Sequence, residues 1–562
     1  MSARSRPTYL DERLNVQPAE AIVPRREHGV IVGLDLGRVF IPRPVLGTEH
    51  EHNIAAQLPH PAQGKPDDVA IPYLLDAVRS LAGRPARGVL KARRNDGPCD
   101  RGRLVVAGPG FAPIQIYDDL SKLEVVFGLH TSAKGLIALQ QAFLPQLREI
   151  ISLAQQNMAQ SLGADPRLLV HLSGGYGDSS CATIHLNIPW AKAVSHAVGT
   201  SMEAFPFLQE SLVRQLATAS SVAATGFPAK ERMLTNPRSH RFNTITGVST
   251  LEPSRAMHFD LLRGRPTEGY DRPGVARNMG MCSCYGQSQV GNFLTLSFGQ
   301  IETLRLHFAV CGRWDSPKLL ETYDNLLALG AEFAEDHQRS SQYMRPALDD
   351  YRAFVSWLKS EVGQEVVDDL IPDCEEALAW AEKVLSAVEQ NDQDALIRTT
   401  DLGKKMLLVD EYLSGRSGGW REHADEIARL CCVFSSPQEH SFYNGYFCPN
   451  GLETPVVNEE DIRNAGPDRL TRTWLVAQLL RKFSHDPLMD HVDFDWDRLE
   501  LTYANVLSGG WVPRIRIEKK AMLLPNSIGH NAPAIGNLLD GIDSLADVFE
   551  VLGTTPQQAA TV

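Results

Sequence analysis

The stretch most informative about the fold reads Leu46-Gly47-Thr48-Glu49-His50-Glu51-His52-Asn53-Ile54. Its composition predicts a β-strand, in which Glu49 and Glu51 point to the same face because side chains alternate along a strand. Two carboxylates at that spacing repel each other unless a cation lies between them. Magnesium is suited to the position, since it takes carboxylate oxygens and keeps coordination positions for phosphate. The alternative is a solvated edge strand with two surface acids.

The composition excludes several classes of function. The chain has 562 residues, 43% of them hydrophobic and 22% charged, with a formal net charge of −13. An acidic chain without a long run of lysine and arginine is not expected to bind nucleic acid. No apolar run is long enough to cross a membrane, and the N-terminus has no signal-peptide core. The nine cysteines show no C-x-x-C spacing, which favours reduced thiols in a cytoplasmic protein.

The chain predicts one large domain and a smaller one. We expect a flexible lead at 1–27, a large domain over 28–430 and a small C-terminal domain over 431–562. Strands are predicted near 28–40, 44–54, 103–107, 114–117, 168–172, 182–188, 494–503 and 511–518. Helices are predicted at 71–81, 136–162, 206–225, over most of 316–484, and at 533–552. A mixture of strands and turns is expected over 241–300. Strands combined with long helices indicate an α+β fold.

The Gly-Thr-Glu-x-Glu pattern resembles the opening strand of the family of Pup ligases and Pup deamidases (depupylases), of the proteasome accessory factor A type. In that family the motif runs Gly-x-Glu-x-Glu-Tyr/Phe-Gly. Further segments are similar to the family in order and rough spacing over residues 45–550. They are Asp401-Leu402-Gly403-Lys404-Lys405-Met406-Leu407-Leu408, Ser441-Phe442-Tyr443-Asn444, Thr471-Arg472, Trp496-Asp497 and Ile535-Gly536-Asn537-Leu538-Leu539-Asp540-Gly541-Ile542-Asp543-Ser544.

The resemblance implies a glutamine-synthetase-like antiparallel sheet cradled by helices, with ATP and magnesium as cofactors. By this resemblance Glu49 and Glu51 hold the metal. The ligase branch joins the C-terminal glutamate of Pup to a lysine amine, and the deamidase branch hydrolyses the amide or isopeptide bond at that residue. The expected partner is a Pup-like small protein or a pupylated protein.

Other site residues also follow from the resemblance. Two pairs are expected to line the nucleotide and substrate site. They are His185 and Asn187, from a strand similar to the family's His-Glu-Asn-Tyr, and Arg277 and Arg472.

The chain departs from the family at several acids. Ala107 stands where the family carries its catalytic aspartate, and an alanine can neither take a proton nor orient a nucleophile. Leu186 stands where the His-Glu-Asn-Tyr strand has its glutamate. Three aspartates are candidates to substitute for the missing acids: Asp118, Asp119 and Asp178.

Three functions are therefore open. The first is an ATP-dependent enzyme acting on a side-chain amide or isopeptide bond of a Pup-like protein. The second is a pseudoenzyme that keeps the cradle and binds a partner. The third is a carboxylate–amine ligase acting on another substrate.

Overall fold

The computed structural model describes residues 21–57, 66–82, 114–172, 205–236, 287–320 and 326–471 with short gaps, and shorter segments elsewhere up to 516. The chain divides into two compact units. We call residues 47–130, 138–170 and 459–562 the sheet unit, and residues 1–46, 131–137 and 171–458 the helical unit. No helix among the described residues is long and apolar enough to cross a membrane. The predicted domain boundary at residue 430 stays a prediction.

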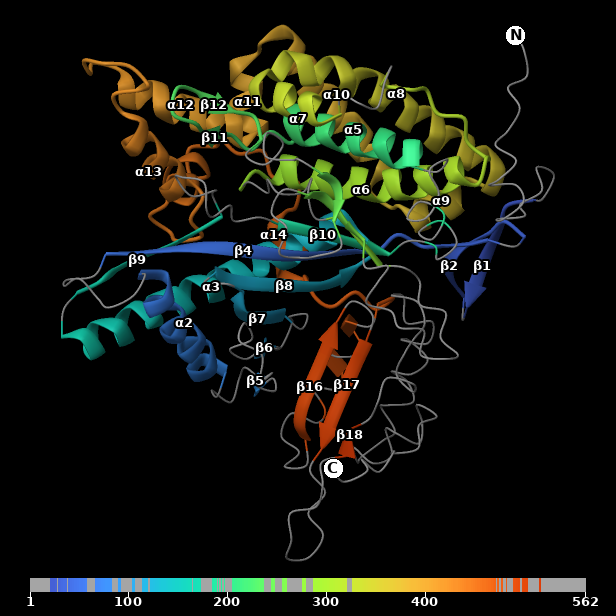
Figure 1. Ribbon diagram of the computed structural model, residues 1–562. Coiled ribbons are helices and arrows are strands. Elements are labelled where there is room, and N and C mark those ends of the chain that lie inside the picture. The colour runs from blue at the N-terminus through green and yellow to red at the C-terminus, as the bar shows by residue number, and fades with distance from the viewer. Residues whose placement is uncertain are drawn as a thin grey trace, which may run out of the picture. The chain divides into compact units, whose positions relative to one another are not determined.

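The sheet unit is built on strands in the order β5-β6-β7-β8-β4, antiparallel from β5 to β8, with β9 also paired to β4 (Figure 1). A second, smaller antiparallel sheet holds β16, β17 and β18. The elements are β4 (Leu46–Gln57), α2 (Pro66–Ala82), β5 (Val89–Lys91), β6 (Leu104–Val106), β7 (Ile114–Asp119), β8 (Lys122–His130), α3 (Ala133–Leu162), β9 (Arg167–His171), α14 (Glu459–Arg463), β16 (Met489–Asp495), β17 (Arg498–Tyr503) and β18 (Ile515–Arg516).

The helical unit packs long helices against one another, with α5 against α6 and α8, and α10 against α6 and α8 (Figure 1). Its strands form the order β1-β2-β3 and the order β13-β14-β15-β10. The strands and early helices are β1 (Val23–Glu27), β2 (Val30–Asp35), β3 (Phe40–Pro42), β10 (Ile184–Pro189), α5 (Phe205–Ser221), β11 (Phe227–Pro228), β12 (Met233–Leu234), β13 (Thr244–Gly247), β14 (Arg255–Phe259), β15 (Val275–Asn278) and α6 (Gln289–Val310). The later helices are α7 (Leu326–Glu335), α8 (His337–Val362), α9 (Gln364–Leu370), α10 (Cys374–Gln390), α11 (Gln393–Thr399), α12 (Asp401–Leu413), α13 (Ala424–Phe434) and the π-helix η3 (Tyr443–Phe447).

The α+β prediction is confirmed, and most predicted elements lie close to observed ones. The strands near 44–54, 114–117, 168–172 and 182–188 are β4, β7, β9 and β10, and the helices at 136–162 and 206–225 are α3 and α5. The single strand predicted over 494–503 is a hairpin of β16 and β17. The helix predicted at 533–552 lies outside the described residues.

Two elements escape the sequence prediction. The prediction of strands and turns over 241–300 is wrong from residue 289, where helix α6 begins. Nearly every residue of α6 is buried, so it lacks the one-sided apolar pattern by which a surface helix is recognised. No strand is predicted at β8, whose residues are buried on both faces and therefore do not alternate between apolar and polar. Both elements are central to their units, which is why their patterns are uninformative.

Buried charges tie three helices of the helical unit together. Asp350 of α8 forms ion pairs with Arg214 of α5, at 3.2 Å, and with Arg305 of α6. Arg305 also donates from Nε to Glu302 at 2.7 Å. Burial raises the pKa of Asp350, and the two arginines oppose that rise. Because a buried charge is costly without its partner, this network strongly favours one arrangement of the three helices.

Candidate functional site

The two glutamates of β4 are buried inside a sheet. Glu49 and Glu51 are 4% and 5% exposed. Their strand is hydrogen-bonded to β8 on one side and to β9 on the other, so it is not an edge strand. The alternative of two solvated surface acids is therefore wrong. Carboxylates taken out of water need cations or hydrogen-bond donors nearby, and such an arrangement is typical of a functional site.

One face of β4 is covered by α3. Gln140 of α3 lies 3.3 Å from Thr48 Oγ1 and 3.2 Å from His50 Nε2. The His50 ring packs on Phe127 of β8, which in turn makes an edge contact with Phe143 of α3. Burial lowers the pKa of His50, and the neighbouring histidine lowers it further. This face is part of the hydrophobic core, where burial favours the uncharged form of His50.

The other face carries the acids. Because side chains alternate, Glu49 and Glu51 point away from the face that holds Thr48 and His50. On β8, the side chains of Lys122 and Glu124 point to this second face, whereas Phe127 points to the face covered by α3. Lys122 Nζ lies 2.8 Å from Glu51 Oε2. Glu124 is 3% exposed, so a third buried carboxylate shares the face.

Glu124 is a site candidate that sequence reasoning missed. It could have been found only by predicting β8 and its pairing, since neither the Gly-x-Glu-x-Glu pattern nor its neighbours point to it. Asp118, proposed as a substitute acid, pairs in register with Leu123, and the same register places it on the α3 face with Phe127. That prediction is corrected: β7 turns Asp118 away from Glu49 and Glu51, although it is buried. The backbone of Asp119 pairs with Lys122.

Two strands of the helical unit carry three of the predicted binding residues. His185 and Asn187 belong to β10, and Arg277 belongs to β15. The antiparallel register places Asn187 directly opposite Arg277, so the backbone brings these two positions together. Their role in binding stays a prediction. Ala107, Asp178 and Arg472 lie outside the described residues.

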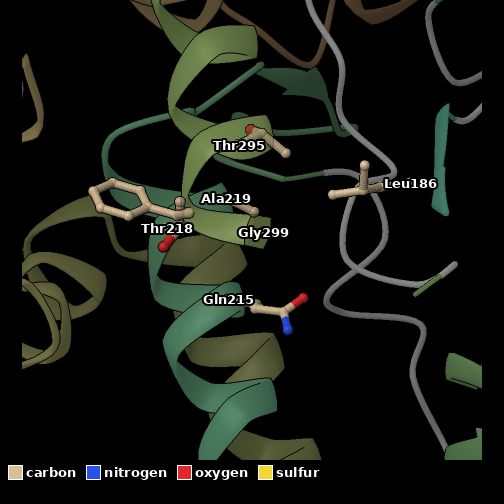
Figure 2. A pocket seen from close by; sticks show the side chains of 7 residues that line it. Leu186, Gln215, Thr218, Ala219, Thr295 and Gly299 are labelled. Carbon is tan, nitrogen blue, oxygen red and sulfur yellow. The ribbon is translucent and has the colours of Figure 1, made fainter. Parts of the chain in front are cut away.

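Leu186, which stands where the family strand has a glutamate, is a buried packing residue. With Ile188 it packs on α6 at Gly299, where an added Cβ would stand 2.7 Å from Leu186 Cδ2. Figure 2 shows the small pocket at this contact. It is lined by Leu186, Gln215, Thr218, Ala219, Thr295, Phe298 and Gly299. The volume open to the centre of a water molecule is about 20 Å³, enough for about one water and too small for a nucleotide. Leu186 is therefore a core residue, and this pocket is a packing feature.

The Asp401 motif has a structural role. Its carboxylate accepts hydrogen bonds from the backbone N–H groups of Gln287, at 2.6 Å, and Ser288, at 2.8 Å, just before α6. Glu453 accepts the N–H of Gln289 at 2.9 Å. Two carboxylates thus satisfy donors at the N-terminus of α6, where the helix dipole also favours negative charge.

The lysines of the same motif add further contacts to those of Asp401 and Glu453 at the start of α6. Lys404 pairs with Glu453 at 2.7 Å. Lys405 donates to the carbonyl oxygens of Thr225, at 2.8 Å, and Gly226, at 2.9 Å. Both lysines are buried, so their charges act at short range in a medium of low dielectric. The motif that carries much of the sequence resemblance therefore holds α12 to the start of α6 and to the segment between α5 and β11.

The described residues offer few ligands for a metal ion. Among them, no group of three or more histidine, cysteine, aspartate or glutamate side chains is arranged to hold a metal ion. Glu49 and Glu51 have the oxygen donors that magnesium prefers, and they share a face. One Glu51 oxygen already faces the Lys122 ammonium. The pair therefore suits one magnesium ion at most, with Lys122 as a competing cation.

Comparison with known proteins supports the fold. No protein-family model matches the chain, and no curated protein matches it in sequence. A crystal structure of the complex between the prokaryotic ubiquitin-like protein Pup and its ligase PafA matches with a TM-score of 0.62 and 15% identity, covering 92% of this chain and 96% of that one. The chain has the PafA fold.

A second structure agrees with this result. The Pup ligase PafA in complex with ADP matches with a TM-score of 0.57 and 14% identity, covering 86% of this chain and 96% of that one. The family resemblance predicted from short motifs is therefore confirmed at the level of the fold and over most of the chain.

Proposed function

We propose that this protein binds ATP and magnesium and acts on a side-chain amide or isopeptide bond of a Pup-like protein, as a distant counterpart of the Pup ligases and deamidases. The observation that carries the proposal is the buried acid pair of β4, within a fold that matches PafA over most of its length. Buried carboxylates that share a face favour a cation close to them, and a magnesium-dependent reaction on a nucleotide would use that preference.

The residues take the following roles in this proposal. Glu49 and Glu51 would hold the magnesium ion, which when bound neutralises phosphate charge and orients the nucleotide. His185 and Asn187 on β10 and Arg277 on the paired strand β15 would line the nucleotide and substrate site. Arg472 would face phosphate, for which a guanidinium is well suited.

Calorimetry with ATP and magnesium tests the proposal on the wild type and on the double variant Glu49→Gln/Glu51→Gln. Glutamine keeps the size of the buried side chain and removes its charge. We expect magnesium-dependent ATP binding in the wild type and its loss in the double variant. Glu376→Gln, in an exposed ion pair with Lys134, is the matched control and should bind as the wild type does. Absence of ATP binding in the wild type would refute the proposal.

A second candidate function is a pseudoenzyme that binds a Pup-like tail or a pupylated protein without chemistry. The observation that favours it is the Lys122–Glu51 ion pair, which supplies a cation without a metal. Incubation of the wild type with a Pup-like protein, ATP and magnesium distinguishes the two. Covalent conjugation, deamidation or release of the modifier would support the enzyme. Tight binding that is unaffected by magnesium and yields no product would support the pseudoenzyme.

A further inference from the structure

We propose that Lys122 is a built-in cation of the β4 acid pair, so that a magnesium ion binds at Glu51 only in competition with the lysine ammonium. This inference rests on the proposed function, because it assigns the regulation of the same site. It adds that the site contains its own counter-ion and that metal affinity is set by a residue outside the Gly-x-Glu-x-Glu pattern.

The first support is the geometry of the ion pair. Lys122 Nζ stands 2.8 Å from Glu51 Oε2, the distance of a charge-assisted hydrogen bond. The side chains are 18% and 7% exposed, so the two charges interact in a medium of much lower dielectric than water. An ammonium so placed compensates the Glu51 carboxylate as a metal ion would.

The second support is the surrounding charge. Glu49 and Glu124 lie on the same face of the sheet and are at least as buried as Glu51. Three carboxylates on one face favour a cation strongly, and their combined field acts on both candidates, the ammonium and the metal. A magnesium ion in contact with Glu51 would stand within a few ångströms of the Lys122 nitrogen, and the two positive charges would repel each other.

The third support is the position of the lysine in its strand. Lys122 is the first residue of β8, whereas Glu51 lies in the interior of β4. Lysine is a compact charge on a flexible four-carbon stem, so it can leave an ion pair by rotating its side chain without moving the backbone. Lys122 is therefore the member of the pair that gives way when a metal ion arrives.

The experiment titrates magnesium alone into the full-length protein and follows binding by calorimetry. Lys122→Met removes the charge and keeps most of the volume, so we expect magnesium to bind at least about tenfold more tightly than in the wild type. Lys122→Arg keeps the charge and should bind magnesium as the wild type does. Lys134→Met, which removes a lysine from the exposed pair with Glu376, is the matched control and should change nothing.

Two further results decide the assignment. The increase in magnesium affinity caused by Lys122→Met should disappear in the double variant Lys122→Met/Glu51→Gln. An increase in affinity that persists in the double variant would overturn the proposal. Unchanged magnesium affinity in folded Lys122→Met would also overturn it. A wild-type readout covers the case in which Lys122→Met fails to fold. Saturating magnesium should increase acylation of Lys122 by an amine reagent, measured by peptide mass spectrometry, and leave Lys134 unchanged. Magnesium binding without that increase would refute the competition.

The outcomes separate this inference from the proposed function. Magnesium-dependent ATP binding in the wild type, with unchanged affinity in Lys122→Met, would overturn the competition and leave the proposed function standing. If Lys122→Met bound magnesium more tightly in a Glu51-dependent way and no variant bound ATP, the competition would stand and the proposed function would be overturned.

Discussion

Removal of the Asp401 carboxylate should destabilise the helical unit more than any other single change in its motif. Asp401 is 1% exposed and accepts two backbone hydrogen bonds, at 2.6 and 2.8 Å, from the residues that lead into α6. Burial raises the pKa of this carboxyl, while Lys405 and Lys404 lower it. The perturbation is Asp401→Ala, with Asp401→Asn as the graded variant.

The magnitude follows from the bonds that are lost. A hydrogen bond to a charged group contributes about 1.5 to 3 kcal/mol, so two of them contribute roughly 3 to 6 kcal/mol. Asp401→Ala loses both and leaves two N–H groups without their carboxylate acceptor at the start of a buried helix. Asp401→Asn keeps one acceptor oxygen and the side-chain volume, so it should cost about half as much. Both values are large for a protein that is marginally stable.

Urea unfolding followed by tryptophan fluorescence measures the change, and hydrogen exchange at the N-terminus of α6 locates it. Asp410→Asn is the matched control, because Asp410 lies on the same helix with an exposed side chain. Its free energy of unfolding should stay within about 0.5 kcal/mol of the wild type. Unfolding of Asp401→Ala at the same urea concentration as Asp410→Asn, or unchanged exchange near α6, would contradict a stabilising role of the Asp401 carboxylate.

Three further predictions concern buried groups of the helical unit. Burial raises the pKa of Glu453 from 4.5 to about 7, so its favourable contribution is full below pH 4.5 and is lost as the pH rises through 7. Thermal midpoints should therefore fall more between about pH 5 and about pH 8 in the wild type than in Glu453→Gln, and parallel profiles would contradict this. His307 behaves oppositely: burial lowers its pKa from 6.5 to about 4, and its Nε2 accepts a backbone N–H at 2.7 Å. Its contribution is present above pH 6.5 and is lost as the pH falls towards 4, so His307→Gln should flatten the acid side of the stability profile. Gly299→Ala should cost about 1 to 3 kcal/mol, since its methyl group would meet Leu186 at 2.7 Å, whereas Gly291→Ala on the same helix meets only ordinary contacts and should be tolerated in urea unfolding.

The contacts of Asp401, Lys404 and Lys405 affect what can be concluded from the sequence resemblance. The motif from Asp401 to Leu408 is one of the longer similarities in the C-terminal part of the chain, and its polar residues stabilise the start of α6 and the segment between α5 and β11. Similarity at this motif therefore supports a shared fold more directly than a shared reaction. Evidence for the reaction must come from β4 and β8, where the carboxylates and the competing lysine lie.

The strand that carries Glu49 and Glu51 and the face they share can be predicted from the residues alone, because period-two alternation is a local property of the chain. The sequence also indicates the α+β class and the long helices α3 and α5, whose apolar spacing is regular enough to read. The family resemblance, drawn from short ordered motifs, led to the fold that the PafA comparison supports.

Which charged groups meet depends on how distant segments of the chain pack together. Lys122 lies 71 positions from Glu51 along the chain, and Glu124 belongs to a strand with no alternating pattern. Asp118 is close to Lys122 and Glu124 in sequence, yet the register of β7 against β8 turns its side chain to the opposite face of the sheet. Local patterns fix the direction of a side chain relative to its own strand. Pairing, register and burial depend on segments far apart in sequence, and these decide whether an acid faces a cation, a helix or the core.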